Sequence, residues 1–207
     1  LVLPPAVAPN QVVFVPVGPW QKNPAILDKI HELQAQLKAA GIRCRVDDSN
    51  NSPGFKFNEW ELRGVPVRIE CGPRDLENAQ VMMKARDLDD KVAVPFENFL
   101  ASVQAELASM QGRLLEKARQ MNQANYYTDI NSLDELKAHI ESKRAAGQVP
   151  GWVLAGWDGT EESEAKIKEE TGFTTRNIPF AGQVPEKATC IVTGQPAKHT
   201  VWLARAY

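Results

Sequence analysis

The segment that decides the fold is SPGFKFNEWELRGVPVRIECGPRD, residues 52–75. It combines three aromatic residues (Phe55, Phe57 and Trp60) with four basic and four acidic residues. Three large aromatic side chains are not needed in an ordinary surface loop. A surface that stacks a flat base and hydrogen-bonds its edges needs both kinds of side chain, since single-stranded RNA is recognised in this way. The composition therefore indicates an RNA-contacting surface.

The sequence on either side of this segment predicts an α/β domain. Residues 11–17 form a continuous apolar run, typical of a strand buried on both faces. Residues 24–37 carry apolar side chains at helical spacing, and Gly41 is a suitable helix stop. Residues 42–46 alternate like a strand. A strand–helix–strand order implies a parallel pair with a right-handed crossover.

The remaining pattern predicts further elements and a domain boundary. In the first half we expect a short helix at 57–62, strands at 65–71, 80–84 and 92–94, and a long amphipathic helix from about residue 96 to 121. The composition changes at residues 122–128. In the second half we expect helices at 132–145 and 161–170, and strands at 152–155, 175–180, 189–192 and 200–203. The sequence thus predicts two small domains, 1–122 and 128–207.

Composition and charge exclude several classes of protein. The chain of 207 residues has no apolar run that could span a bilayer and no signal segment at its start, so we expect a cytoplasmic protein. Three widely spaced cysteines argue against a disulfide framework. The net charge of −2 excludes a binder that depends on counterion release, so any RNA contact must be local and geometric.

Several motifs, in chain order, resemble one family of tRNA-binding enzymes. They are LPP at 3–5, AP and QVV within 8–13, PGFKFNEWELRGVPVRIE and GPRD within 53–75, EET at 169–171, TTR and PF within 174–180, and ARAY at 204–207. Together they resemble the C-terminal half of prolyl-tRNA synthetases of the archaeal/eukaryotic-like type. The resemblance implies a class II synthetase anticodon-binding domain, with a mixed sheet flanked by helices, followed by a small α/β domain.

The resemblance also implies a function. The enzymes of this family are ligases that activate proline with ATP and magnesium and transfer it to proline tRNA. Their catalytic domain would precede Leu1, so we expect this chain to be an inert fragment with no cofactor of its own. Dimerisation in the family runs mostly through the catalytic domain. The full enzyme is therefore expected to be a homodimer and this chain a monomer.

By the same resemblance, the site residues read the two guanines that end the proline anticodon. Phe57 would stack on a base, and Glu61 would accept from the N–H groups of a guanine. Arg68, Arg74, Asp75 and Lys91 match positions that line the same pocket. Tyr207 matches a chain end that docks towards the catalytic domain.

Without the resemblance, the same residues have ordinary interpretations. Phe57 at helical spacing from Trp60 could be a core residue, and Glu61 with Arg68 a surface ion pair of little energetic worth. Gly72 to Asp75 fits a turn in which Asp75 caps the next segment. These alternatives remain open at the level of sequence.

Many members of the family hold a structural zinc with four cysteines in the C-terminal domain. The matching positions here are Asp158, Ser163, Cys190 and Thr193, of which one is a thiol. Zinc requires four soft or borderline donors in a tetrahedron, so we expect no zinc. Packing would then hold the domain together, through a set of five apolar residues: Trp152, Ile167, Phe180, Val201 and Trp202.

Two other classes of function compete. A non-catalytic accessory protein could reuse an anticodon-binding fold as an RNA-binding module. A small-molecule α/β enzyme would need a site at the strand ends, but residues 16–20 after the first strand form no glycine-rich phosphate loop. No nucleophile has an evident base partner either.

Overall fold

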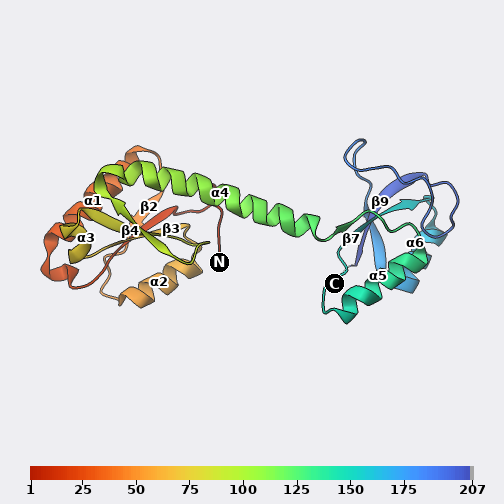
Figure 1. The fold of residues 1–207 in the computed structure, drawn as a ribbon, viewed down its shortest axis with the longest axis horizontal. Coiled ribbons are helices and arrows are strands. Elements are labelled where there is room, and N and C mark those ends of the chain that lie inside the picture. Colours follow the sequence, from red (N-terminus) through yellow and green to blue (C-terminus); the bar gives the residue numbers. More distant parts are fainter. Residues whose placement is uncertain (206–207) are drawn as a thin grey trace. The chain divides into compact units, whose positions relative to one another are not determined.

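Figure 1 shows the computed structural model, which describes residues 1–205. Its contacts divide the chain into one unit from Leu1 to Ala118 and a second that starts at Arg119. The division falls inside helix α4 (Phe99–Gln123), whereas the sequence prediction placed the end of the first domain later, at residue 122. The expected architecture, two α/β domains with mixed sheets and helices, is confirmed.

A five-stranded sheet with the order β2-β1-β3-β4-β5 forms the centre of the first unit. Strand β1 (Val12–Pro16) is buried at every position because it lies between β2 (Cys44–Val46) and β3 (Val67–Cys71), which both run parallel to it. The parallel pair predicted from the sequence is therefore confirmed. Strands β4 (Gln80–Ala85) and β5 (Lys91–Pro95) are antiparallel, which makes the sheet mixed.

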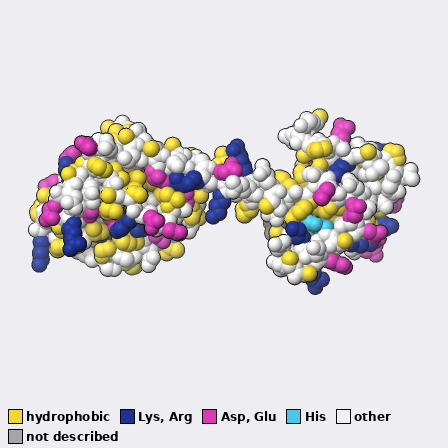
Figure 2. All heavy atoms as spheres, viewed as in Figure 1, with side chains coloured by type: hydrophobic (Ala, Val, Ile, Leu, Met, Phe, Trp, Pro, Cys, Tyr) yellow, Lys and Arg dark blue, Asp and Glu magenta, His cyan; other side chains and the backbone are white. Residues whose placement is uncertain are grey.

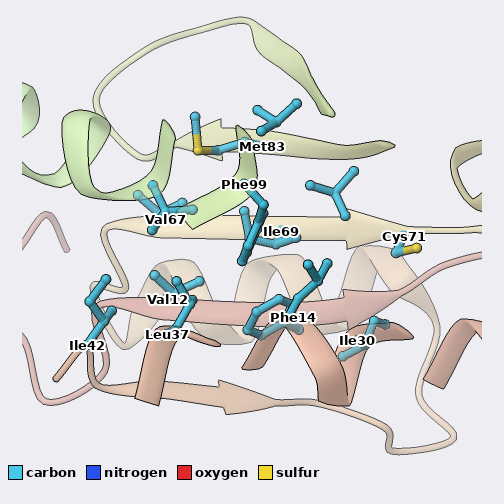
Figure 3. Packing of buried hydrophobic residues seen from close by; sticks show 14 of the residues in the cluster. Val12, Phe14, Ile30, Leu37, Ile42, Val67, Ile69, Cys71, Met83 and Phe99 are labelled. Carbon is cyan, nitrogen blue, oxygen red and sulfur yellow. The ribbon is translucent and has the colours of Figure 1, made fainter. Parts of the chain in front are cut away.

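Helices cover the two faces of this sheet unequally. Helix α1 (Pro24–Ala39) and the first half of α4 pack on one face through Ile26, Ile30, Leu33, Leu37, Phe99, Val103 and Leu107. Figure 3 shows the strand side chains of this core, among them Val12, Phe14, Val67 and Ile69. Short helices connect the elements: η1 (Trp20–Lys22), α3 (Pro73–Glu77) and η2 (Phe96–Asn98).

Helix α2 (Pro53–Leu62) lies on the opposite face of the sheet (Figure 1). It begins earlier than the predicted residue 57 because Ser52 caps it, accepting a hydrogen bond from the Phe55 N–H at 3.4 Å, and because Pro53 suits the first turn. Trp60 packs with Val13 and Val15, and Phe57 is half-buried beside them. Over β3 to β5 this face carries the charged residues Arg68, Glu70, Lys84 and Lys91.

The second unit contains a four-stranded sheet with the order β6-β7-β9-β8. Its strands are β6 (Tyr126–Tyr127), β7 (Trp152–Trp157), β8 (Phe173–Asn177) and β9 (His199–Arg205). Helices α5 (Leu133–Ala145) and α6 (Glu161–Thr171) pack on one face. Both helices are capped at their N-termini, since the Ser132 and Thr160 hydroxyls accept from backbone N–H groups of the first turns.

Two strand predictions in this unit are wrong. Residues 189–192 form no strand, only the isolated bridges Gly156↔Cys190 and Thr189↔Pro196. The strand predicted at 175–180 is β8, which ends at Asn177 after an irregularity in its pairing with β9. Pro179 lacks the N–H that a continued ladder would need.

The predicted core of this unit is correct for two residues of five. Ile167 and Val201 are buried, but Phe180 is 81% exposed and Trp152 39% exposed. Trp202 is half-buried and its ring lies 5.0 Å from that of Tyr126. Trp202 pairs with Leu154 across the ladder, so it shares the sheet face that the helices do not cover. Successive side chains of a strand point to opposite faces of the sheet, so Trp202 points away from the helix-covered core that was predicted for it.

The chain end, the helix lengths and the surface charges also bear on the function. Tyr207, predicted to dock towards a catalytic domain, lies outside the described residues. None of the helices in residues 1–205 has the length and apolar character needed to cross a membrane. Figure 2 shows acidic and basic side chains interspersed over the visible face of the first unit.

Candidate nucleic-acid interface

The side chains of helix α2 that face the sheet determine how the helix is rotated. Lys56 and Trp60, four residues apart, point to the sheet and are buried. Their polar atoms are bound by the segment after β2: the Lys56 Nζ donates to the Asp47 carbonyl at 2.9 Å and the Trp60 indole N–H to the Asp47 carboxylate at 2.7 Å. These contacts fix the rotation of the helix. Phe57 and Glu61 consequently lie on the flank that faces β3.

The strand register gathers basic side chains on the same face. Arg68 of β3 pairs with Lys84 of β4, and Lys84 pairs with Lys91 of β5. Directly paired residues of antiparallel strands point to the same side of the sheet. The three cations therefore form a row beside α2.

Arg68 lies at the centre of the site. Its guanidinium carbon is 3.8 Å from the centroid of the Phe57 ring. Its Nη1 donates to a Glu61 oxygen at 3.3 Å, and its Nε and Nη2 donate to one Glu70 oxygen at 3.1 Å and 3.0 Å. A helix ring, a helix carboxylate and a strand carboxylate thus hold one guanidinium.

Glu70 connects Arg68 to Lys91. Its side chain is only 5% exposed, and its second oxygen accepts a hydrogen bond from the Lys91 Nζ at 2.9 Å. The Lys91 side chain itself is half-exposed. The sequence interpretation missed Glu70 as a site residue, although its place two residues after Arg68 on a strand puts both on one face.

A small hollow of about 70 Å³ opens beside Glu61, and its lining includes Arg68, Lys84 and Arg86. Glu61 is 38% exposed, and its second oxygen is 3.9 Å from an Arg86 nitrogen. A partly solvated carboxylate surrounded by cations can accept from the N–H groups of a planar ligand. Arg86 follows β4 directly, a position that no spacing rule marks in the sequence.

Arg74 and Asp75 lie outside this contact network, in α3 beyond the end of β3. The Asp75 carboxylate accepts from the Gly72 N–H at 2.9 Å, as a helix cap does. Arg74 is exposed, and within residues 1–205 its side chain makes no hydrogen bond or ion pair. The structure therefore brings together four of the six predicted residues: Phe57, Glu61, Arg68 and Lys91.

Comparison with known proteins assigns both units. The family described as the anticodon binding domain matches residues 11–106, and the family described as the C-terminal domain of prolyl-tRNA synthetase matches residues 133–207. The chain belongs to the prolyl-tRNA synthetase family. The candidate interface lies wholly within the first match.

Curated relatives in this family carry the name proline–tRNA ligase. Identity is 47% over 207 residues with the protein of Symbiobacterium thermophilum, 45% over 208 with that of Alkaliphilus oremlandii and 44% over 208 with that of Acetoanaerobium sticklandii. Each comparison covers all of this chain but only 41–42% of the relative. Such similarity over the whole chain does not favour an unrelated accessory protein.

The four residues predicted from the sequence to match zinc positions lie together, and Asp158 is bound by the others. The Asp158 carboxylate accepts from the Ser163 hydroxyl at 2.6 Å and from the Thr193 hydroxyl at 3.3 Å, and the nearby Cys190 thiol helps to lower its pKa. The Ser163 hydrogen bond is the main reason that the pKa of Asp158 falls to about 2. Within residues 1–205 no three His, Cys, Asp or Glu side chains are grouped to hold a metal. One thiol, one carboxylate and two hydroxyls do not fit zinc.

The surroundings of two of the three cysteines make their thiols poor nucleophiles. Burial, reinforced by the charge of Asp75, raises the pKa of Cys71 to about 11. Burial also raises the pKa of Cys44. Both thiols stay protonated at neutral pH and are poor nucleophiles.

Proposed function

We propose that this chain binds the anticodon of proline tRNA and reads its two guanines at the site on α2, β3 and β5. The observation that carries the proposal is the Arg68 guanidinium, held against the Phe57 ring between Glu61 and Glu70. Aromatic rings and guanidinium planes are the surfaces on which proteins stack unpaired RNA bases.

The chemistry of the site suits guanine. Guanine presents N–H donors on its Watson–Crick edge and acceptors at O6 and N7. Glu61 would accept from the donors, because its carboxylate is the exposed one of the two that contact Arg68. Arg68 and Lys91 would donate to the acceptors. Arg74 and Asp75 would contact RNA only if the bound strand extends to the end of β3.

The whole protein would be a proline–tRNA ligase. The chain spans about two fifths of the length of its relatives, and the rest would contain the catalytic domain that uses ATP and magnesium. We expect a cytoplasmic homodimer for the whole protein, a monomer for this chain, and no zinc in either. Tyr207 would dock towards the catalytic domain.

Protection of the anticodon from cleavage tests the proposal. Proline tRNA is exposed to a ribonuclease that cuts after unpaired guanines, with and without a saturating amount of the chain. Protection of the two anticodon guanines, with unchanged cleavage of guanines elsewhere, is expected. Unchanged cleavage at the anticodon would refute the proposal.

A further inference from the structure

We propose that Glu70 is a positioning residue: it holds Arg68 and Lys91 in one arrangement before any RNA arrives. Its part in RNA recognition rests on the anticodon function proposed above. Its effect on Arg68 in the free protein does not.

Glu70 is too buried to contact RNA itself. Its side chain is 5% exposed, against 38% for Glu61 and 51% for Lys91. It lies between Val15 of β1 and Met82 of β4 in the register of the sheet, with α2 on the same face. Any influence of Glu70 on a ligand must therefore pass through the groups it touches.

Both Glu70 oxygens are occupied by predicted RNA-binding cations. One oxygen accepts from Nε and Nη2 of Arg68, and the other accepts from Lys91 Nζ. Hydrogen bonds between ionised groups are stronger than those between neutral groups, and a guanidinium held through two nitrogens has a fixed plane. Glu70 therefore sets the plane in which Arg68 meets the Phe57 ring.

Stability alone does not account for a carboxylate at this place. Burying an ion pair often stabilises a fold no better than apolar residues of the same volume, because the charges lose their hydration. Apolar neighbours such as Val15 and Met82 would suit an apolar residue at position 70. A carboxylate at position 70 holds Arg68 in place, and an apolar residue there could not.

The arrangement leaves part of Arg68 free for a ligand. Its Nε and one N–H of Nη2 are directed to Glu70, and Nη1 to Glu61. A guanidinium carries five N–H donors, so others remain. Fixing a long side chain in advance removes a cost that binding would otherwise carry, which raises specificity for the geometry that fits.

The first test needs no RNA. In the free chain labelled with ¹⁵N, the Arg68 Nε–H group should give a distinct NMR signal that exchanges slowly with water. In Glu70→Gln that signal should broaden or exchange at least about tenfold faster, because the amide offers one acceptor oxygen and no charge. An unchanged Arg68 signal would overturn the proposal.

The second test measures selectivity. The preference of the chain for the proline anticodon stem-loop over one with both guanines replaced should fall about fivefold or more in Glu70→Gln. Affinity for the replaced RNA should stay within about twofold, since phosphate contacts are unaffected. Glu59→Gln is the matched control, because Glu59 binds Arg63 on the other flank of α2.

A combined variant separates positioning from a structural role. If Glu70 acts through the two cations it holds, Glu70→Gln should reduce selectivity by less than about twofold in a background that carries both Arg68→Ala and Lys91→Ala. A full loss in that background would overturn the proposal. If Glu70→Gln does not fold, Glu70→Met, which suits the apolar neighbours, replaces it in every arm.

The two proposals fail in different ways. If the unmodified chain shows no preference for guanine but the Arg68 signal depends on Glu70, the anticodon function fails and the positioning role stands. If the preference is present but independent of Glu70, the positioning role fails alone.

Discussion

The Arg68 guanidinium of β3 lies 3.8 Å from the centroid of the Phe57 ring of α2. A strand residue and a helix residue thus form one stacked pair on the polar face of the first sheet. Two carboxylates, Glu61 and Glu70, hold the guanidinium at its edges. The pair is therefore oriented before a ligand binds.

Replacing Arg68 by Lys should abolish most of the selectivity for the guanines. Lysine keeps the charge but not the planar fork or the stacking surface. A lost bidentate contact to a base costs about 1–3 kcal/mol of discrimination, so the affinity ratio between the two RNAs should fall about tenfold. Competition binding with the two stem-loops measures this ratio. Arg63→Lys, on the other flank of α2 and stacked on Trp60, should leave it unchanged.

Replacing Phe57 by Leu should weaken binding of the proline stem-loop. Leucine preserves apolar packing but offers no flat face, and one base–aromatic stack contributes about 1–3 kcal/mol. Titration of the stem-loop should therefore show a loss of about tenfold in affinity. Phe55→Leu is the matched control on the same helix, since Phe55 is exposed and lies outside the Arg68 network. Equal losses in both variants would contradict a specific role for Phe57.

The central strands and helices were predicted well where the spacing of apolar residues in the sequence matched the residues that are buried. The strand–helix–strand order implied the parallel pair of β1 and β2. The resemblance named Phe57, Glu61, Arg68 and Lys91, which lie together in the structure. The spacing of two put Glu70 on the same strand face as Arg68, but its burial and its contact with Lys91 follow from tertiary packing and were therefore missed. The contact between Glu70 and Lys91 depends on the strand register, which brings Lys91 of β5 to the same sheet face although β4 lies between the two strands.

The second unit was predicted less well because large aromatic residues were taken as core residues. Trp152 and Trp202 lie on the sheet face that the helices leave open, and the exposed Phe180 follows the end of β8. Which face of a short strand the helices cover depends on tertiary packing rather than on local composition. The missing strand at 189–192 has a similar cause, since Gly156 lets this segment cross β7 closely with only single bridges.

Removing the Lys56 side chain should destabilise the first unit. Lys56 is 1% exposed, and its Nζ donates to the Asp47 carbonyl and lies 5.4 Å from the centroid of the Trp20 ring. Lys56→Ala leaves a cavity and an unpaired acceptor, so the free energy of unfolding should fall by about 2 kcal/mol or more. Chemical denaturation followed by tryptophan fluorescence measures it. Lys22→Ala, at an exposed position in η1, should change it by less than about 0.5 kcal/mol.

The Asp158 cluster should stabilise the second unit in a pH-dependent way. Its pKa falls to about 2 in the folded chain, chiefly through the Ser163 hydrogen bond, from an ordinary value of 3.8. A depressed carboxyl pKa contributes stability above the ordinary value, and this contribution disappears as the pH falls through the folded value. Asp158→Asn should therefore lower the melting temperature at pH 7, and the difference from the unmodified chain should close between pH 4 and pH 2. Asp129→Asn, at an exposed carboxylate, should show no such convergence.

Zinc should be absent from the purified chain. Metal analysis should find far less than one zinc per chain, and a chelator should leave the melting temperature unchanged, because the four positions offer one thiol. A triple variant, Asp158→Cys, Ser163→Cys and Thr193→Cys, supplies the missing thiols and is the positive control. Stoichiometric zinc in the unmodified chain would contradict this prediction, because it would mean that Asp158 and its neighbours bind a metal and not one another.

The most direct test of the anticodon assignment is the affinity ratio of the unmodified chain for two stem-loops that differ only in the two anticodon guanines. The measurement is made at low and at physiological salt, since a net charge of −2 leaves little counterion-driven binding. The account predicts a preference of about tenfold or more for the guanine-containing RNA, maintained at both salt concentrations, as expected for contacts to base edges. Equal affinities, or a preference that disappears as salt rises, would contradict it.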